Sequence, residues 1–130
     1  MSEARVPTRK STLRDPAADP PRATLRVLLV EDSADDAELI ICQLERGGYR
    51  VISERVETRE DLLASLRDSS WDVVLSDYAM PQFSGPEALE LVKARGLDLP
   101  FIIVSGAVGE EAAVRVMRSG AHDYVLKQSL

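Results

Sequence analysis

Cysteine is almost absent from the sequence, and the single Cys42 excludes an intrachain disulfide. Cys42 lies among apolar residues in a helical pattern, so we expect a reduced thiol packed inside the protein. No apolar run approaches the roughly 18 residues that a membrane-spanning helix needs. The N-terminal segment is polar and rich in proline, without the apolar core of a signal peptide. These absences favour a cytoplasmic protein that does not interact with membranes.

Positive charge is scarce beyond the first 26 residues. The chain of 130 residues has a net charge of −6, yet residues 1–26 carry six basic and three acidic side chains. Because this first segment carries +3, the remaining residues carry −9. An acidic domain repels the phosphates of nucleic acids, so we expect no direct nucleic-acid contact by this segment.

The first 24 residues have no hydrophobic period. They contain four prolines and scattered charges, a composition that predicts a disordered, basic, proline-rich leader over residues 1–24. A basic docking arm is an alternative role for it. Residues 25–130 then form one domain, which is long enough to bury a core without disulfides.

Apolar runs and helical patterns alternate from residue 25 onward. The runs at 25–30, 50–56, 72–76, 101–105 and 123–127 predict five strands. Four helices are predicted between them, the first ending near Arg46 at a glycine pair, the third near Arg95, and the fourth spanning about 110–119 with Met117 facing inward. We expect the first three helices to begin with capping boxes, formed by Ser33 with Asp36, Thr58 with Asp61, and Ser84 with Glu87.

This alternation predicts an α/β fold built of right-handed βαβ units, with a parallel sheet covered by helices on both faces. In such folds the functional site lies outside the carboxyl ends of the strands. Polar residues follow four of the predicted strands at that edge: Glu31, Asp32, Asp77, Ser105 and Lys127. Singly, each has an ordinary explanation, such as a helix N-terminal acid, a turn cap, a strand-end hydroxyl or a solvated lysine. Their coincidence at one sheet edge favours a site.

The chemistry of these residues is that of phosphoryl transfer. Three neighbouring carboxylates repel each other, and a divalent cation is the usual remedy. Oxygen ligands without nearby cysteine or histidine favour Mg²⁺ over zinc. A lysine and a serine hydroxyl at the same edge can neutralise and hydrogen-bond phosphoryl oxygens.

The stretches "VLLVEDS", "VVLSDYAMPQFSG", "IIVSGAVGEE" and "GAHDYVLK" resemble the receiver domains of two-component response regulators. The resemblance extends from Leu25 to Leu130 in the same order and spacing. It implies a flavodoxin-like, doubly wound, five-stranded parallel sheet of order 2-1-3-4-5. The last two stretches look more like receivers attached to hybrid or sensory kinases than like those of DNA-binding regulators.

The resemblance also implies a role for each site residue. Asp77 would accept a phosphoryl group from a histidine kinase or phosphotransfer protein, and Ser105 and Lys127 would hold the phosphoryl oxygens. Tyr124 would turn inward when Ser105 moves. The ligands of Mg²⁺, or of Mn²⁺, would be Asp32, Asp77, the backbone carbonyl of Ala79 and, through a water, Glu31. The protein would be a signalling switch that catalyses only its own phosphorylation and dephosphorylation and acts on a downstream output domain or protein. The resemblance is compatible with both a monomer and a dimer.

Two features depart from the family pattern. Gln128 follows Lys127 where a proline is usual, and the chain stops before the family's final helix. Lack of that helix would bare apolar side chains from the first, third and fifth strands, unless a further segment, a partner or the leader covers them. Ala79 and Ala107 lie where side chains influence access of water to the acyl phosphate, so we expect dephosphorylation that is neither assisted nor blocked there.

Other functions fit the sequence less well. A degenerate receiver, used only for docking, would lack some of the five site residues. A flavin or cobalamin domain would have a glycine-rich loop after the first strand and no cluster of acids to repel an anionic cofactor. A haloacid-dehalogenase-type phosphatase would have its nucleophile after the first strand in an Asp-x-Asp pattern. The only histidine, His122, is expected on the surface beside a glycine turn.

Overall fold

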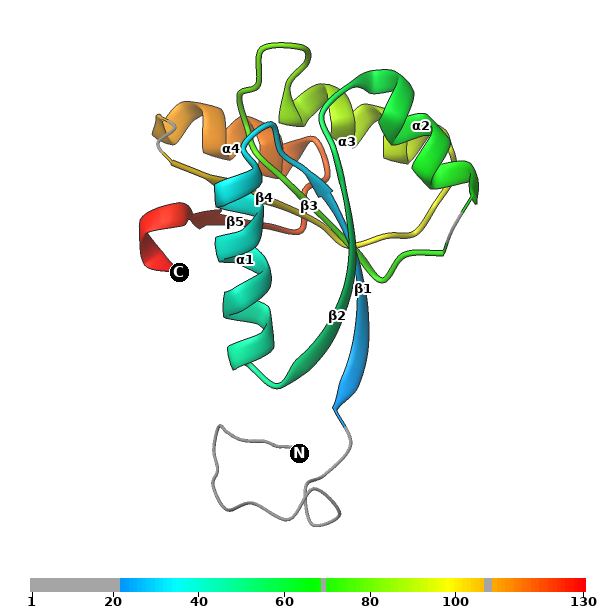
Figure 1. Cartoon of the computed structure of the whole chain (residues 1–130). Helices are drawn as coiled ribbons and strands as arrows, with labels where there is room; N and C mark the ends of the chain where they lie inside the picture. The colour runs from blue at the N-terminus through cyan, green and yellow to red at the C-terminus, as the bar shows by residue number, and fades with distance from the viewer. Residues whose placement is uncertain (1–21, 69, 107–108) are drawn as a thin grey trace, which may run out of the picture.

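The computed structural model describes residues 22–68, 70–106 and 109–130. Strands and helices alternate along these residues (Figure 1). Their order is β1 (Ala23–Val30), α1 (Ala34–Arg46), β2 (Tyr49–Val56), α2 (Arg59–Asp68), β3 (Val73–Ser76), α3 (Gly85–Ala94), β4 (Phe101–Ser105), α4 (Glu110–Arg118), β5 (Asp123–Leu126) and the 3₁₀ turn η2 (Lys127–Ser129). Within these ranges, none of the helices has the length and apolar character required to cross a bilayer.

The strands form one parallel sheet of order β2-β1-β3-β4-β5, which confirms the predicted flavodoxin-like arrangement. β1 lies between β2 and β3, with Val30 in register with Val56 on one side and Ser76 on the other. The strand order changes direction at β1 and β3. A crevice forms outside the carboxyl ends of strands at such a switch point, so the residues after β1 and β3 are placed to form a site.

Helices cover the two faces of the sheet unequally (Figure 1). On one face, α2, α3 and α4 pack over a larger core that includes Leu28, Val74 and Ile103. On the other, α1 packs over a smaller core that includes Val27 and Leu29. Successive residues of a strand point to opposite faces, so a strand covered on both sides is apolar throughout. This explains the continuous apolar runs at residues 27–30 of β1 and 101–104 of β4.

The predicted helix starts are confirmed. Ser33 is the N-cap of α1, and its hydroxyl accepts a hydrogen bond from the Asp36 N–H at 3.2 Å. Thr58 receives the equivalent bond from the Asp61 N–H at 3.1 Å. The complete capping box is confirmed for α3, formed by Ser84 and Glu87, whereas the boxes predicted for α1 and α2 show only the bond to the Ser33 or Thr58 hydroxyl among the described residues. These side chains satisfy backbone N–H groups that have no partner within the helix.

Two side-chain placements were predicted wrongly. Cys42 is exposed rather than packed, because it lies two residues, or about 200° of helical rotation, past the buried Ile40. Met117 is 39% exposed, whereas its neighbour Val116 is buried. Val116 is the one residue that α4 buries fully, so the buried face of α4 is narrower than the apolar pattern suggests.

The predicted boundary of the leader also needs correction. Ala23 and Thr24, which we assigned to the leader, belong to β1 and pair with Tyr49 and Arg50 of β2. Residues 1–21 of the leader, and Ala107, lie outside the described residues, so the predictions made for them stay predictions.

The expectation of bare apolar side chains is confirmed only in part. Val27 and Leu29 of β1 are at most 1% exposed, because α1 covers them. Val73 of β3 and Val125 of β5 are half-buried. Cover on this face therefore varies along the strands, since Leu75 of β3 is buried whereas Val73 is not.

Candidate functional site

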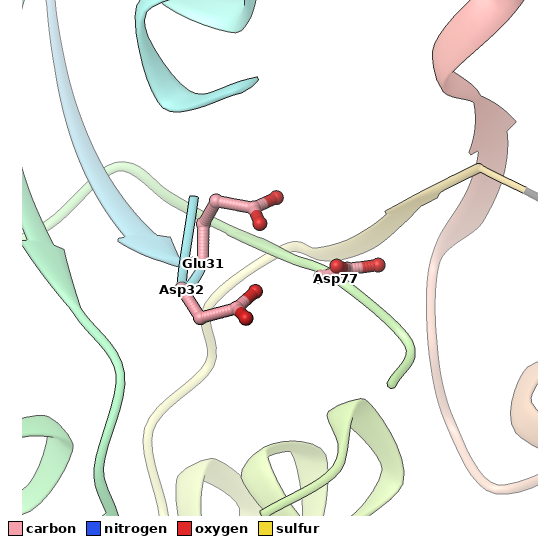
Figure 2. Close-up of side chains that lie close together, drawn as sticks. All are labelled: Glu31, Asp32 and Asp77. Atoms are coloured by element: carbon pink, nitrogen blue, oxygen red, sulfur yellow. The ribbon is translucent and has the colours of Figure 1, made fainter. Parts of the chain in front are cut away.

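Three carboxylates meet where β1 and β3 end. Glu31 and Asp32 follow β1, and Asp77 follows β3 (Figure 2). The sheet ladder continues one residue beyond the strands, since the Asp77 N–H donates to the Val30 carbonyl at 2.9 Å. Carboxylate oxygens of all three residues lie within 4.8 Å of one another. The structure thus brings together the three acids that the sequence predicted.

Glu31 is the most buried of the three acids, at 1% exposed. Burial raises the pKa of Glu31, although contact with Lys127 and a hydrogen bond from the Ser33 N–H act in the opposite direction. The Ser33 N–H donates to Oε2 at 3.2 Å. Oε1 lies 2.9 Å from Lys127 Nζ, but has no hydrogen bond of good geometry among the described residues. A buried carboxylate oxygen is costly unless a cation or a donor compensates it, and here the Lys127 ammonium gives part of that compensation.

Lys127 lies at the start of η2 and points its ammonium group at the acids. Nζ is 2.7 Å from Asp36 Oδ2, 2.9 Å from Glu31 Oε1 and 3.4 Å from Asp77 Oδ2. Burial alone would lower the pKa of Lys127, but the hydrogen bond to Asp36 and the ion pair with Glu31 outweigh it and raise this pKa. The lysine is therefore a fixed positive charge at the site.

The two carboxylate oxygens of Asp77 have different surroundings. Oδ1 accepts a hydrogen bond from the Tyr78 N–H at 2.8 Å, and Oδ2 faces Lys127. The side chain is 12% exposed, so it stays accessible at the sheet edge. The Ser76 hydroxyl donates to the Asp77 backbone carbonyl at 2.8 Å. These bonds fix the main chain and one oxygen, and leave the other oxygen facing a cation.

Gly85 supports Asp77 from behind, which the sequence did not reveal. Its N–H donates to the Tyr78 carbonyl at 2.7 Å. A Cβ at this position would lie 2.5 Å from the Asp77 carbonyl oxygen, far inside contact distance. A glycine in the first turn of a helix, where it weakens the helix, is the signal that could have indicated this close backbone approach.

The other predicted site residues lie at the same edge or next to it. Ser105 ends β4, is 4% exposed and pairs in register with Leu126, the residue before Lys127. Ala79 lies in the loop after β3, two residues beyond Asp77. Tyr124 packs against the larger core, and its hydroxyl is buried without a hydrogen-bond partner among the described residues.

Asp36 is a site contact that the sequence assigned only to a helix cap. His122 has a further contact that was not predicted. It is exposed as expected, yet its Nδ1 accepts a hydrogen bond from the Phe101 N–H at 2.9 Å. This bond closes the start of β4 against the start of β5, so the role of His122 is structural.

The donor set fits a hard divalent cation. Within the described part of the chain, the cluster consists of carboxylates alone. Oxygen-only ligands suit Mg²⁺ or Mn²⁺ and disfavour zinc. A bound dication would also compensate the buried Glu31 oxygen that lacks a hydrogen bond. The acidic pocket is thus of the kind in which receiver domains typically bind Mg²⁺.

Comparison with known proteins identifies the family. Residues 27–129 match the model of the response regulator receiver domain. The chain is 36% identical over 107 residues to protein-glutamate methylesterase/protein-glutamine glutaminase 2 of Caulobacter vibrioides, covering 81% of this chain and 30% of that protein. It is 30% identical over 104 residues to the phosphate regulon transcriptional regulatory protein PhoB of Klebsiella pneumoniae, covering 78% of this chain and 44% of that protein.

A solved structure agrees with these sequence matches. The signal receiver domain of a signal transduction histidine kinase from Syntrophus aciditrophicus superposes with a TM-score of 0.63 at 28% identity, covering 79% of this chain and 78% of that domain. The chain spans less than half the length of the two curated relatives named above. Together with the sheet order and the acidic edge, these matches show that the chain belongs to the receiver domain family of two-component response regulators.

Proposed function

We propose that the chain accepts a phosphoryl group on Asp77 and works as a phosphorylation-dependent signalling switch. The observation that carries this proposal is the position of the Asp77 carboxylate, which lies between two further acids and the Lys127 ammonium at one sheet edge. Acids, a fixed cation and a buried hydroxyl are the groups that phosphoryl transfer needs.

In the proposed reaction, an Asp77 carboxylate oxygen attacks phosphorus in line with the leaving group. A P–O bond forms to Asp77, and the bond between phosphorus and the donor breaks. Lys127 neutralises charge on an equatorial phosphoryl oxygen, and the Ser105 hydroxyl donates a hydrogen bond to another. Asp32, Asp77, the Ala79 carbonyl and, through a water, Glu31 would hold Mg²⁺ or Mn²⁺. That ion, when bound, supplies positive charge that orients and neutralises the phosphoryl group.

The switch would follow from the new contact between Ser105 and the phosphoryl group. A ligand shifts a conformational equilibrium only through contacts that differ between the two states. Ser105 would gain such a contact on phosphorylation, and Tyr124, on the neighbouring strand β5, would respond to it. Its buried hydroxyl lacks a partner among the described residues, which supports a side chain that gains a contact in a second state.

The partners we propose are a histidine kinase or phosphotransfer protein as donor and an output domain or protein as target, in the cytoplasm. The protein would act on no external substrate and would catalyse only its own phosphorylation and dephosphorylation. The relatives named above include a transcriptional regulator, a methylesterase and a histidine kinase. Receivers accompany such different outputs that family membership does not specify the output of this chain. An output like that of receivers in hybrid kinases stays a prediction.

The test is phosphorylation of the full chain by acetyl phosphate. We expect intact mass to show the gain of one phosphoryl group in the presence of Mg²⁺ and none when EDTA is added. Asp77→Asn should take up no phosphoryl group. Unchanged labelling of Asp77→Asn would refute the proposal, and a wild-type chain that takes no label would favour a docking module that works without phosphorylation.

A further inference from the structure

Asp36 is placed like a capping residue but does not cap its helix. It occupies the third position of α1, as Glu87 does in α3. In α3, the Glu87 carboxylate accepts a hydrogen bond from the Ser84 N–H at 2.8 Å, which completes the box. In α1, the equivalent Ser33 N–H donates to Glu31 Oε2 instead. The Asp36 carboxylate is therefore released from its local partner.

The released carboxylate binds Lys127. The distance from Lys127 Nζ to Asp36 Oδ2 is 2.7 Å, the shortest of its three ion pairs, against 3.4 Å to Asp77 Oδ2. The Asp36 main chain is itself fixed, since its N–H donates to the Ser33 hydroxyl. Asp36 thus anchors the lysine to the first turn of α1, and the lysine lies farther from Asp77 than from Asp36.

We propose that Asp36 is a positioning residue that holds Lys127 in the unphosphorylated protein and opposes phosphorylation of Asp77. This inference rests on the proposed function of Asp77. A phosphoryl group on Asp77 must attract the ammonium that Asp36 holds, so part of the Lys127–Asp36 ion pair is lost when the acyl phosphate forms. The Asp36 carboxylate can then turn to the Ser33 N–H, as Glu87 does in α3, in place of Glu31.

The proposal predicts a gain of reactivity when the anchor is removed. We expect Asp36→Asn to accelerate labelling by acetyl phosphate and Mg²⁺ about threefold to tenfold, the size expected for one charge-assisted hydrogen bond at a half-exposed site. Asp35→Asn is the matched control, because Asp35 is exposed in the same helical turn and its substitution removes the same charge. Its rate should stay within about twofold of wild type. Asp36→Glu keeps the carboxylate and should lie closer to wild type than Asp36→Asn does.

A double-mutant cycle tests whether the effect passes through Lys127. In a Lys127→Gln background, Asp36→Asn should no longer change the labelling rate, a result that a purely structural role of Asp36 in α1 would not produce. Equal labelling rates for Asp36→Asn and Asp35→Asn, or slower labelling of Asp36→Asn, would overturn the inference about Asp36. Labelling at Asp77 in the same experiment would still support the proposed function. A wild-type chain that takes no phosphoryl group would overturn both.

Discussion

Glu31 is a buried acid in the cluster that we propose as the Mg²⁺ site. Because burial raises its pKa, the folded state binds this proton more tightly than the unfolded chain does. The corresponding contribution to stability is fully present below the unfolded pKa and is lost as the pH rises through the folded value. Above the folded pKa of Glu31 the protein therefore carries a destabilising carboxylate, which a divalent cation would help to compensate.

This linkage gives a pH dependence at the residue scale. We expect Mg²⁺ to raise the thermal unfolding temperature more at about pH 8 than at about pH 5, since protons compete with the cation for Glu31. Scanning calorimetry with and without Mg²⁺ measures both shifts. Glu31→Gln removes the titrating group, so the difference between the two pH values should shrink. Equal Mg²⁺ shifts at both pH values in the wild-type protein would contradict the expectation.

The identity of the acids at the site was predictable, but the pairing of their side chains was not. Glu31, Asp32 and Asp77 could be placed because carboxyl ends of parallel strands meet at one edge. The contact of Lys127 with Asp36 joins residues 91 positions apart. This contact is possible because the Ser33 N–H donates to Glu31 and not to Asp36. The capping pattern in the sequence does not distinguish between these two acceptors. The bond from the Phe101 N–H to His122 is likewise visible only in three dimensions.

At the scale of elements, α3 fits tightly against the end of β3. The contact is formed by Gly85, whose missing Cβ would meet the Asp77 carbonyl oxygen at 2.5 Å and Ile103 Cδ1 at 2.9 Å. Backbone and a core side chain would both have to move to accept a methyl group. The position of α3 and the main chain that carries Asp77 are therefore coupled.

We expect Gly85→Ala to lower the free energy of unfolding by about 1–3 kcal/mol, as overpacking does in a filled site. It should also slow phosphorylation, because the Asp77 main chain is displaced. Gly106→Ala is the control for stability, since a Cβ there meets no atom of the described residues within 4 Å. Urea denaturation of both variants measures the two changes. A Gly85→Ala protein as stable as Gly106→Ala would show that α3 can shift without cost.

Helix starts were easier to predict than the faces that helices bury. Ser33, Thr58 and Ser84 form local hydrogen bonds within three residues, so the sequence contains both partners. Burial depends instead on how far a helix overlaps the sheet. α4 fully buries only Val116, so Met117, one residue on, is largely exposed although its residue type suggested an inward position.

At the scale of the whole molecule, the two faces of the sheet differ in cover. Ile103 points into the larger core and is 0% exposed, whereas its neighbour Ile102 points to the α1 face and is only partly buried. The two isoleucines share one strand and one side-chain type. They therefore report how well each face is covered in the protein.

We expect Ile103→Ala to lower the free energy of unfolding by about 2–5 kcal/mol, the usual loss for a buried isoleucine. Ile102→Ala should cost clearly less, because less of its surface is removed from water. Chemical denaturation of the two variants at equal protein concentration gives the comparison. Equal losses would show that the α1 face is covered as fully as the other.

Two kinds of evidence in the sequence predicted the fold. Alternating apolar runs and helical patterns predicted a parallel sheet, while the strand order came from the family resemblance rather than from periodicity. The sheet order confirms that resemblance. The uneven cover of the two faces could be predicted only roughly, because it depends on which strand residues α1 packs against in three dimensions.

The central claim is that Asp77 is the phosphoacceptor, and trapping the acyl phosphate tests it most directly. Borohydride reduces an aspartyl phosphate to homoserine, so the modified position can be read from peptide masses after labelling with acetyl phosphate and Mg²⁺. We expect homoserine at position 77 and at no other acidic position. Homoserine at position 31, 32 or 36, with Asp77 unmodified, would contradict the claim.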